Sequence, residues 1–264
     1  MVRAPYMKAI VLSAGQGSRL LPLTVSKPKC LIDFSGRSLL EWQLEALHCG
    51  GVTEVVVVTG FAADQVEAML ALRTPVGLKV RTVFNPFYKV ADNLATCWLV
   101  RQEMAGPCLV LNGDTLVEPS IVRQLIEAPA SAITVTVDRK SQYDADDMKV
   151  CATGRRLTAI GKTLDADSVD AESIGFLRFS PEGAARFIEQ IEQVMRTADG
   201  VKLWYLSAIN ALAQAGVDVQ IESIEGLQWG EVDFHPDVAR ARTITAAWAA
   251  RWLPQVPVRP AAGA

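Results

Sequence analysis

The sequence predicts an α/β fold, a Rossmann-like arrangement with a mostly parallel central sheet and helices on both faces. Short apolar runs rich in β-branched residues alternate with segments whose apolar residues recur at helical spacing through the first half of the chain. Half of the 264 residues are hydrophobic, which is enough for a substantial core. Longer strands and a hairpin turn follow in the second half, and they predict a small antiparallel region.

In the first half, each expected strand is a short apolar run and each expected helix carries an apolar stripe. The Gly50-Gly51 pair suits a helix C-cap, and Asp92 or Asn93 suits an N-cap. The expected strands are 9–12, 54–59, 80–84 and 108–111, and the expected helices are 39–49, 62–72 and 93–104.

In the second half, the turn at 153–156 separates two short apolar runs and predicts a hairpin. Two of the expected helices, 181–195 and 205–215, are amphipathic. The expected strands are 132–138, 149–152, 157–160, 175–179 and 219–223, and the expected helices are 119–125, 181–195, 205–215 and 238–252.

Composition excludes several classes of protein. The net charge of −3 argues against general nucleic-acid binding. The longest apolar runs, such as 9–12 and 55–58, are too short to span a bilayer, and no signal-peptide pattern is present. The five cysteines lack paired spacing and there are only two histidines, so we expect reduced thiols and no zinc site. We therefore expect a cytoplasmic protein with no nucleic-acid partner and no stable membrane association.

A glycine loop with two cations follows the first expected strand. Gly15 and Gly17 lack a Cβ, so the backbone there can approach a polyphosphate closely. Ser13 and the loop N–H groups can donate to phosphate oxygens. Arg19 adds a planar guanidinium fork and Lys29 adds a point charge. The pattern predicts a phosphate-binding loop; the alternative is an ordinary strand-to-helix turn with a surface Arg and Lys.

The loop is neither a dinucleotide fingerprint, because Leu20 replaces the third glycine, nor a Walker A motif, because no Gly-Lys-Ser/Thr closes it. It resembles the signature of the sugar-phosphate and phosphoalcohol nucleotidyltransferases, which reads G-x-G-x-R, then x-x-P-x-T, then P-K. The matching residues are Gly15, Gly17, Arg19, Pro22, Thr24, Pro28 and Lys29. The resemblance implies the nucleotidyltransferase fold and transfer of a nucleotide to a phosphorylated acceptor.

Acidic residues stand where a metal is expected. Asp114 follows the strand 108–111, and ligands of an open parallel sheet lie beyond such strand ends. Mg²⁺ is usually held by one or two carboxylates and substrate phosphates. The alternative for Asp114 is a turn residue that caps the helix at 119–125. With the glycine loop alongside, we favour a metal ligand.

A second acidic pair, Glu231 and Asp233, is two residues apart, so in a strand both side chains share one face. In the resembled family, an acid in a W-x-D element completes the Mg²⁺ site. Glu231 occupies that aspartate position, and Asp233 matches a second acid that cytidylyltransferase members carry. Which of the two contacts the metal stays open; the alternative is a solvated pair on an edge strand.

The segment 85–99 replaces the glycine-rich base loop of members that use uracil, thymine or guanine nucleotides. It is similar to bacterial choline-phosphate cytidylyltransferases, and also to inositol-phosphate and aminoethylphosphonate cytidylyltransferases. Thr96 stands for their usual Ser and Asp92 for their first Asn. The resemblance implies CTP as the nucleotide. The expected nucleotide-binding residues are Ser13, Ala14, Gly15, Gly17, Asn85, Tyr88, Asn93 and Thr96.

The resemblance implies Mg²⁺-dependent attack of an acceptor phosphate on the α-phosphorus of CTP, with release of pyrophosphate. A phosphate is already an anionic nucleophile, so no general base is needed. Arg19 would hold the pyrophosphate and Lys29 the α-phosphate. Lys162 would meet the acceptor phosphate, with Lys149 as a second candidate; the alternative for each is an exposed lysine.

The acceptor is expected to be a small phosphorylated alcohol, with choline phosphate preferred. Inositol phosphate, aminoethylphosphonate and glycerol phosphate stay open, because aromatic residues can form either a cage for a quaternary ammonium or plain core. The aromatic candidates are Phe87, Tyr88, Trp98, Trp204, Tyr205 and Trp229. Alternative functions are a sugar-1-phosphate nucleotidyltransferase using UTP, dTTP or GTP, and a non-catalytic nucleotide-binding regulatory protein.

No internal linker is visible, so we expect a single domain over 1–253. Its nucleotide-binding half spans about 7–115 and its acceptor-binding half about 116–245. The sequence is also compatible with an oligomer. Residues 1–6 are expected to be a loose extension, and the Pro-, Ala- and Gly-rich 254–264 a disordered tail.

Overall fold

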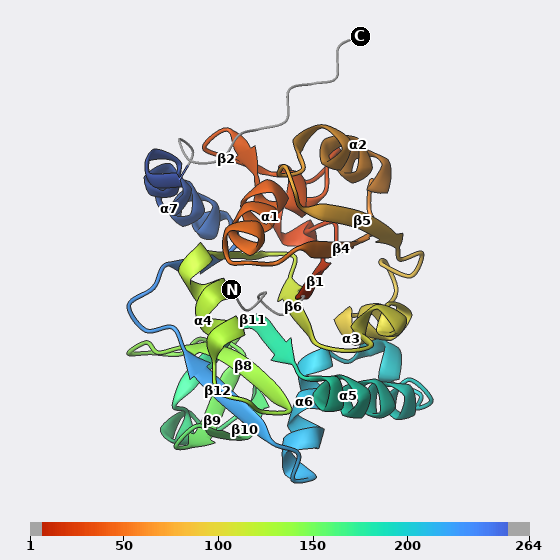
Figure 1. Ribbon diagram of the computed structural model, residues 1–264, viewed down its shortest axis with the longest axis vertical. Coiled ribbons are helices and arrows are strands. Elements are labelled where there is room, and N and C mark those ends of the chain that lie inside the picture. Colours follow the sequence, from red (N-terminus) through yellow and green to blue (C-terminus); the bar gives the residue numbers. More distant parts are fainter. Residues whose placement is uncertain (1–6, 253–264) are drawn as a thin grey trace, which may run out of the picture. The chain divides into compact units, whose positions relative to one another are not determined.

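A computed structural model describes residues 7–252 of the chain (Figure 1). The expected extension at 1–6 and tail at 254–264 lie outside the described residues. The described chain divides into two compact units. The first unit comprises 7–86, 112–123 and 228–252, and the second comprises 87–111 and 124–227. Neither unit is one continuous stretch of the chain, since the first unit resumes at 112–123 and again at 228–252. The single domain, with a nucleotide-binding half and an acceptor-binding half, stays a prediction.

The first unit is built on three parallel strands, in the order β5-β4-β1. They are β1 (Lys8–Leu12), β4 (Glu54–Thr59) and β5 (Lys79–Phe84). Val55 of β4 lies opposite Ala9 of β1 and Val80 of β5. The four valines of β4 are completely buried, as expected of a strand covered on both faces. Because the strands are parallel, the loops that follow them lie at one edge.

Three helices belong to this unit: α1 (Leu39–Cys49), α2 (Ala63–Arg73) and α7 (His235–Trp252). A capping box starts α1, because the Ser38 side chain accepts from the Glu41 N–H and the Glu41 carboxylate accepts from the Ser38 N–H. Trp42 of α1 packs edge-to-face on Trp248 of α7, with ring centroids 6.0 Å apart. These contacts join the two helices in one apolar core.

Two small antiparallel ribbons complete the first unit. One is β2 (Asp33–Phe34) with β3 (Arg37–Ser38), and the other is β7 (Thr115–Val117) with β13 (Trp229–Glu231). The sequence did not predict β2, β3 or β7, because two or three residues are too few for an alternating pattern to show.

The second unit holds strands in the order β6-β11-β8-β12-β10-β9. Among the described strands of this unit, β12 (Val219–Ser223) and β8 (Ile133–Asp138) pair in parallel, and the other pairs are antiparallel. The long strand β11 (Ala171–Phe179) is antiparallel to β6 (Cys108–Asn112) and to β8. The α/β class is therefore confirmed, while the antiparallel pairing is more extensive than the small region that the sequence predicts.

The expected hairpin is present as β9 (Lys149–Thr153) and β10 (Arg156–Gly161). The helices of this unit are α3 (Asn93–Leu99), α5 (Pro181–Val194) and α6 (Tyr205–Gln214), and α4 (Pro119–Glu127) starts in the first unit and ends here. The expected helix at 93–104 is shorter: α3 ends before Val100, and a 3₁₀ turn, Arg101–Met104, follows. A last-turn change of this kind is common at helix ends.

We predict that Ser38→Ala lowers the free energy of unfolding by about 1 kcal/mol, because α1 loses its N-cap hydrogen bonds. Urea unfolding monitored by circular dichroism measures this loss. An unchanged unfolding midpoint would show that packing alone fixes the start of α1.

Candidate active site

The glycine loop folds back onto its own lysine. Gly17 has a φ of 80°, and a Cβ there would lie 2.8 Å from the Cβ of Lys29. Thr24 donates its hydroxyl to the Gly17 carbonyl at 2.8 Å, and the Lys29 N–H donates to the Gln16 carbonyl at 3.1 Å. Gly17 is therefore required for the loop's shape, whereas a Cβ at Gly15 would meet no atom within 4 Å.

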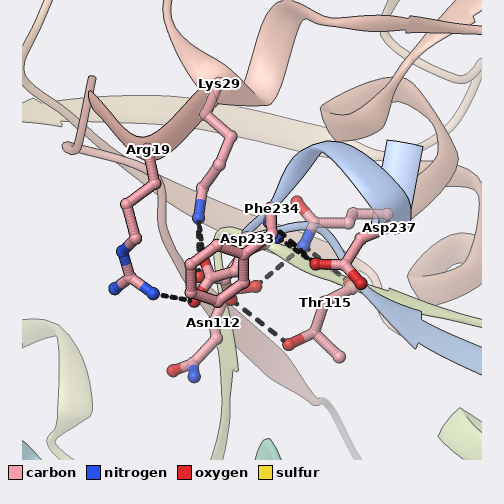
Figure 2. A network of polar contacts seen from close by, with 9 residues as sticks. Arg19, Lys29, Asn112, Thr115, Asp233, Phe234 and Asp237 are labelled. Atoms are coloured by element: carbon pink, nitrogen blue, oxygen red, sulfur yellow. Dashed lines mark hydrogen bonds and ion pairs between the residues drawn. The ribbon is translucent and has the colours of Figure 1, made fainter. Parts of the chain in front are cut away.

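Lys29 joins the two acidic regions that the sequence singled out. Its Nζ donates to Asp114 Oδ2 at 2.8 Å. It also donates to Asp233 Oδ1 at 2.7 Å (Figure 2). Burial alone would lower the pKa of Lys29, but the charges and hydrogen bonds of the two carboxylates raise it above its ordinary value. The two carboxylates thus favour the charged form of the lysine that they hold.

Arg19 approaches the same carboxylate from the solvent side. Its Nη1 donates to Asp233 Oδ2 at 3.0 Å, and its Cζ lies 5.0 Å from the centre of the Phe234 ring (Figure 2). The Arg19 side chain is half exposed. Its remaining donors can therefore reach an anion in solvent, as a phosphate-binding fork requires.

The backbone that carries Asp233 is fixed by a residue that sequence reasoning missed. Asp237 Oδ2 accepts the N–H of Asp233 at 3.1 Å and of Phe234 at 2.8 Å (Figure 2). The signal was present, because Asp237 stands in the first turn of α7, where an acid accepts free N–H groups. The sequence led us to expect Glu231 and Asp233 on one face of a strand, but β13 ends at Glu231. The turn before α7, and not a strand, sets the position of Asp233.

Three carboxylates form the candidate metal centre. Ligand oxygens of Asp114, Glu231 and Asp233 all lie within 4.8 Å of one another. The pairing of β7 with β13 sets Glu231 opposite Thr115, and the Val232 N–H donates to the Asp114 carbonyl at 3.0 Å. Carboxylate oxygens are the donors that Mg²⁺ prefers, so the set fits this ion. Asp114 with either Glu231 or Asp233 would hold it, and the choice between the two stays open.

The other residues expected to bind nucleotide in the first unit lie at strand ends. Ser13 is buried after β1, and its Oγ has no hydrogen-bond partner among the described residues. The Ala14 carbonyl accepts the Phe61 N–H at 3.0 Å, and the Asn85 N–H donates to the Thr59 carbonyl at 2.7 Å. These contacts hold the loops after β1, β4 and β5 together; their contact with a base stays a prediction.

In the second unit, α3 carries most of the remaining candidates. Asn93 Oδ1 accepts the Tyr205 N–H at 2.9 Å and so ties α3 to the start of α6. Thr96 is buried on the same helix, and Tyr88 is partly exposed before it. The side-chain oxygen of Asn93 thus has a structural partner, and contact of its amide with a base stays a prediction.

Lys162 and Trp204 form a cation–π pair in the second unit. The Lys162 Nζ lies 4.5 Å from the centre of the Trp204 ring and 3.6 Å from Asp146 Oδ1. The Asp92 N–H donates to the Val201 carbonyl at 2.8 Å, which brings the start of α3 beside this segment. Burial raises the pKa of Asp92 and the charge of Lys162 partly offsets that rise. An aromatic face, a cation and an acid are thus close neighbours.

Lys149, the second candidate for the acceptor phosphate, is buried and holds backbone instead. Its Nζ donates to the Asp144 carbonyl at 2.6 Å and to the Lys162 carbonyl at 3.0 Å. It therefore fixes the backbone of Lys162 and of the segment before β9.

Comparisons with known proteins identify the family of the chain. The family model described as Nucleotidyl transferase matches residues 8–154, and the chain belongs to that family. Among residues 7–252, no helix has the length and apolar composition needed to cross a bilayer.

Three relatives show what the chain is similar to. The CTP:phosphoglutamine cytidylyltransferase of Campylobacter jejuni is 25% identical, over 88% of this chain and 98% of its own. The choline-phosphate cytidylyltransferase of Streptococcus pneumoniae is 25% identical, over 90% of this chain and 98% of its own. The structure of the inositol-1-phosphate CTP transferase from T. maritima superposes with a TM-score of 0.75 at 21% identity, covering 89% of this chain and 94% of that one. That structural likeness supports the fold.

We predict that Lys29→Met tightens the binding of Mn²⁺ to the acidic cluster by about tenfold in the absence of nucleotide, because a nearby positive charge is removed. Electron paramagnetic resonance of free Mn²⁺ measures the affinity. Lys27→Met, which also removes a lysine from the loop but breaks no described ion pair, is the control. Weaker binding by the Lys29 variant would contradict the arrangement described.

Proposed function

We propose that this nucleotidyltransferase is a Mg²⁺-dependent cytidylyltransferase that transfers CMP from CTP to a small phosphorylated alcohol and releases pyrophosphate. The observation that supports this most is Lys29 held between Asp114 and Asp233 beside the glycine loop, with Arg19 on the same carboxylate. Two cationic and three acidic side chains gathered in this way suit a reaction that moves negative charge between phosphates.

In the proposed step, an oxygen of the acceptor phosphate attacks the α-phosphorus of CTP. A new P–O bond forms as the bond from the α-phosphorus to the bridging oxygen breaks, and that electron pair leaves with pyrophosphate. Lys29 stabilises charge on the α-phosphate, and Arg19 binds the departing pyrophosphate. A magnesium ion held by Asp114 with Glu231 or Asp233 would neutralise further charge on the triphosphate. No residue has to remove a proton, because the acceptor phosphate is already anionic.

Two lines support CTP as the nucleotide. Both sequence relatives described above, which match over nearly their full lengths, are named as cytidylyltransferases. The segment 85–99 also lacks the glycine-rich base loop of members that use other nucleotides. Asn93 already accepts the Tyr205 N–H with its oxygen, so its NH₂ group is the part that would donate to cytosine.

The aromatic residues of the second unit support an acceptor with a cationic head. Trp98 already stacks with Arg101, whose Cζ lies 4.4 Å from the ring centre, and Tyr205 is completely buried. Trp204 is 42% exposed, and the Lys162 ammonium lies over its ring. When Lys162 turns to the acceptor phosphate, the Trp204 face and Asp92 would receive a positively charged group. Choline phosphate has this chemistry and is the preferred acceptor.

The test is pyrophosphate release with Mg²⁺, in which CTP, UTP, GTP, dTTP and ATP are each crossed with five acceptors. The acceptors are choline phosphate, aminoethylphosphonate, inositol phosphate, glycerol phosphate and glucose-1-phosphate. We expect turnover with CTP and choline phosphate, and none for Asp114→Asn. Turnover only with the sugar phosphate and UTP, dTTP or GTP would contradict the proposal. Nucleotide binding without any turnover would favour the regulatory alternative.

We predict that Trp204→Leu raises the KM for a cationic acceptor by about tenfold and leaves the KM for CTP unchanged, because a desolvated cation–π contact is lost. Trp98→Leu is the matched control, since that ring is already covered by Arg101. Equal effects of the two substitutions, or a change confined to CTP, would exclude Trp204 from acceptor recognition.

A further inference from the structure

Gln43 is a buried amide in the middle of α1. It has no exposed surface, and its neighbours Trp42 and Leu44 are equally buried. Its Oε1 has no hydrogen-bond partner among the described residues. A buried polar atom without a partner destabilises the fold, and a leucine would avoid that cost. The presence of an amide at this position therefore calls for a specific contact.

That contact is with the turn that carries Asp114. The Gln43 Nε2 donates to the Asn112 carbonyl at 2.8 Å and to the Thr115 carbonyl at 2.9 Å. These two carbonyls lie on either side of Gly113-Asp114. Both partners are acceptors, so only the NH₂ group of the amide can face them, and its two N–H groups suit the two bonds. The amide thus links the two ends of the turn by hydrogen bonds.

The same turn is pressed against the end of β1 from another direction. A Cβ at Gly113 would lie 2.3 Å from the Leu12 carbonyl oxygen, so no larger residue fits without movement. The Asp114 carbonyl accepts the Val232 N–H at 3.0 Å, which couples the turn to the Glu231–Asp233 segment. Of the hydrogen bonds to these three carbonyls described here, those from Gln43 come from a side chain, and that side chain belongs to α1.

We infer that Gln43 is a positioning residue that sets the Asp114 carboxylate for the metal, by holding both ends of the turn 112–115. This inference rests on the proposed function, in which Asp114 is a metal ligand. Gln43 would not bind the metal itself, because its hydrogen bonds are with the backbone carbonyls beside Asp114. Loss of such outer contacts commonly weakens metal affinity or activity by about 10- to 100-fold.

The experiment compares Gln43→Met and Gln43→Leu with the unchanged protein. Both substitutions introduce an apolar side chain of similar size that suits a helix, and both remove the two N–H donors. Mn²⁺ affinity is measured by isothermal titration calorimetry without nucleotide, and the Mg²⁺ concentration for half-maximal turnover is measured with saturating CTP. We expect Mn²⁺ affinity to fall about tenfold or more. We also expect turnover to return towards its original value at high Mg²⁺.

Ser38→Ala is the matched control, because it destabilises the start of the same helix without contacting the turn. Thermal unfolding is recorded for every variant. A similar loss of Mn²⁺ affinity in Ser38→Ala would show that general destabilisation of α1 is the cause and would overturn the inference. Unchanged Mn²⁺ affinity in a folded Gln43 variant would also overturn it.

Asp114→Asn separates this inference from the proposed function. If Asp114→Asn loses Mn²⁺ and the Gln43 variants keep it, only the role of Gln43 fails. If Asp114→Asn binds Mn²⁺ like the unchanged protein, the metal assignment fails and the role of Gln43 fails with it. Loss of affinity in both sets of variants, with Ser38→Ala unaffected, supports the inference.

Discussion

The site depends on one interaction, the ammonium of Lys29 held between the carboxylates of Asp114 and Asp233. Carboxylates so close together repel one another, and a partly buried group of like charges is unfavourable unless a cation neutralises it. Lys29 supplies that cation from the glycine loop. The loop, the turn after β6 and the turn before α7 are therefore joined by charge as well as by backbone hydrogen bonds.

Other features of the first unit keep this arrangement in place. Gly17 gives the loop a left-handed turn and leaves room for the Lys29 side chain, and Thr24 bonds the same turn. Asp237 fixes the backbone of Asp233 from the start of α7, and β7–β13 pairing aligns Thr115 with Glu231. A reaction that proceeds by positioning and charge neutralisation needs this kind of preorganised frame.

Local signals predicted much of the fold, and contacts between distant segments account for most of the rest. The bounds of α1 and β4 agree with the sequence pattern, because Ser38 caps the helix and an unbroken run of valines marks the strand. The antiparallel pairing of β11 with β6 and β8 was underestimated, since strand direction depends on long-range topology. The candidates Lys29 and Asp114 followed from motifs, but they are 85 residues apart and no periodicity predicts their ion pair. The same reason hid Gln43, which is indistinguishable in sequence from other polar residues of a helix.

The most direct test of the central claim is a crystal structure with CTP and Mn²⁺, using the anomalous signal of the metal. The account predicts a peak about 2.2 Å from oxygens of Asp114 and of Glu231 or Asp233. It also predicts that the Lys29 Nζ then leaves at least one carboxylate for a phosphate oxygen. A peak away from these acids, or a Lys29 that contacts no phosphate, would contradict it.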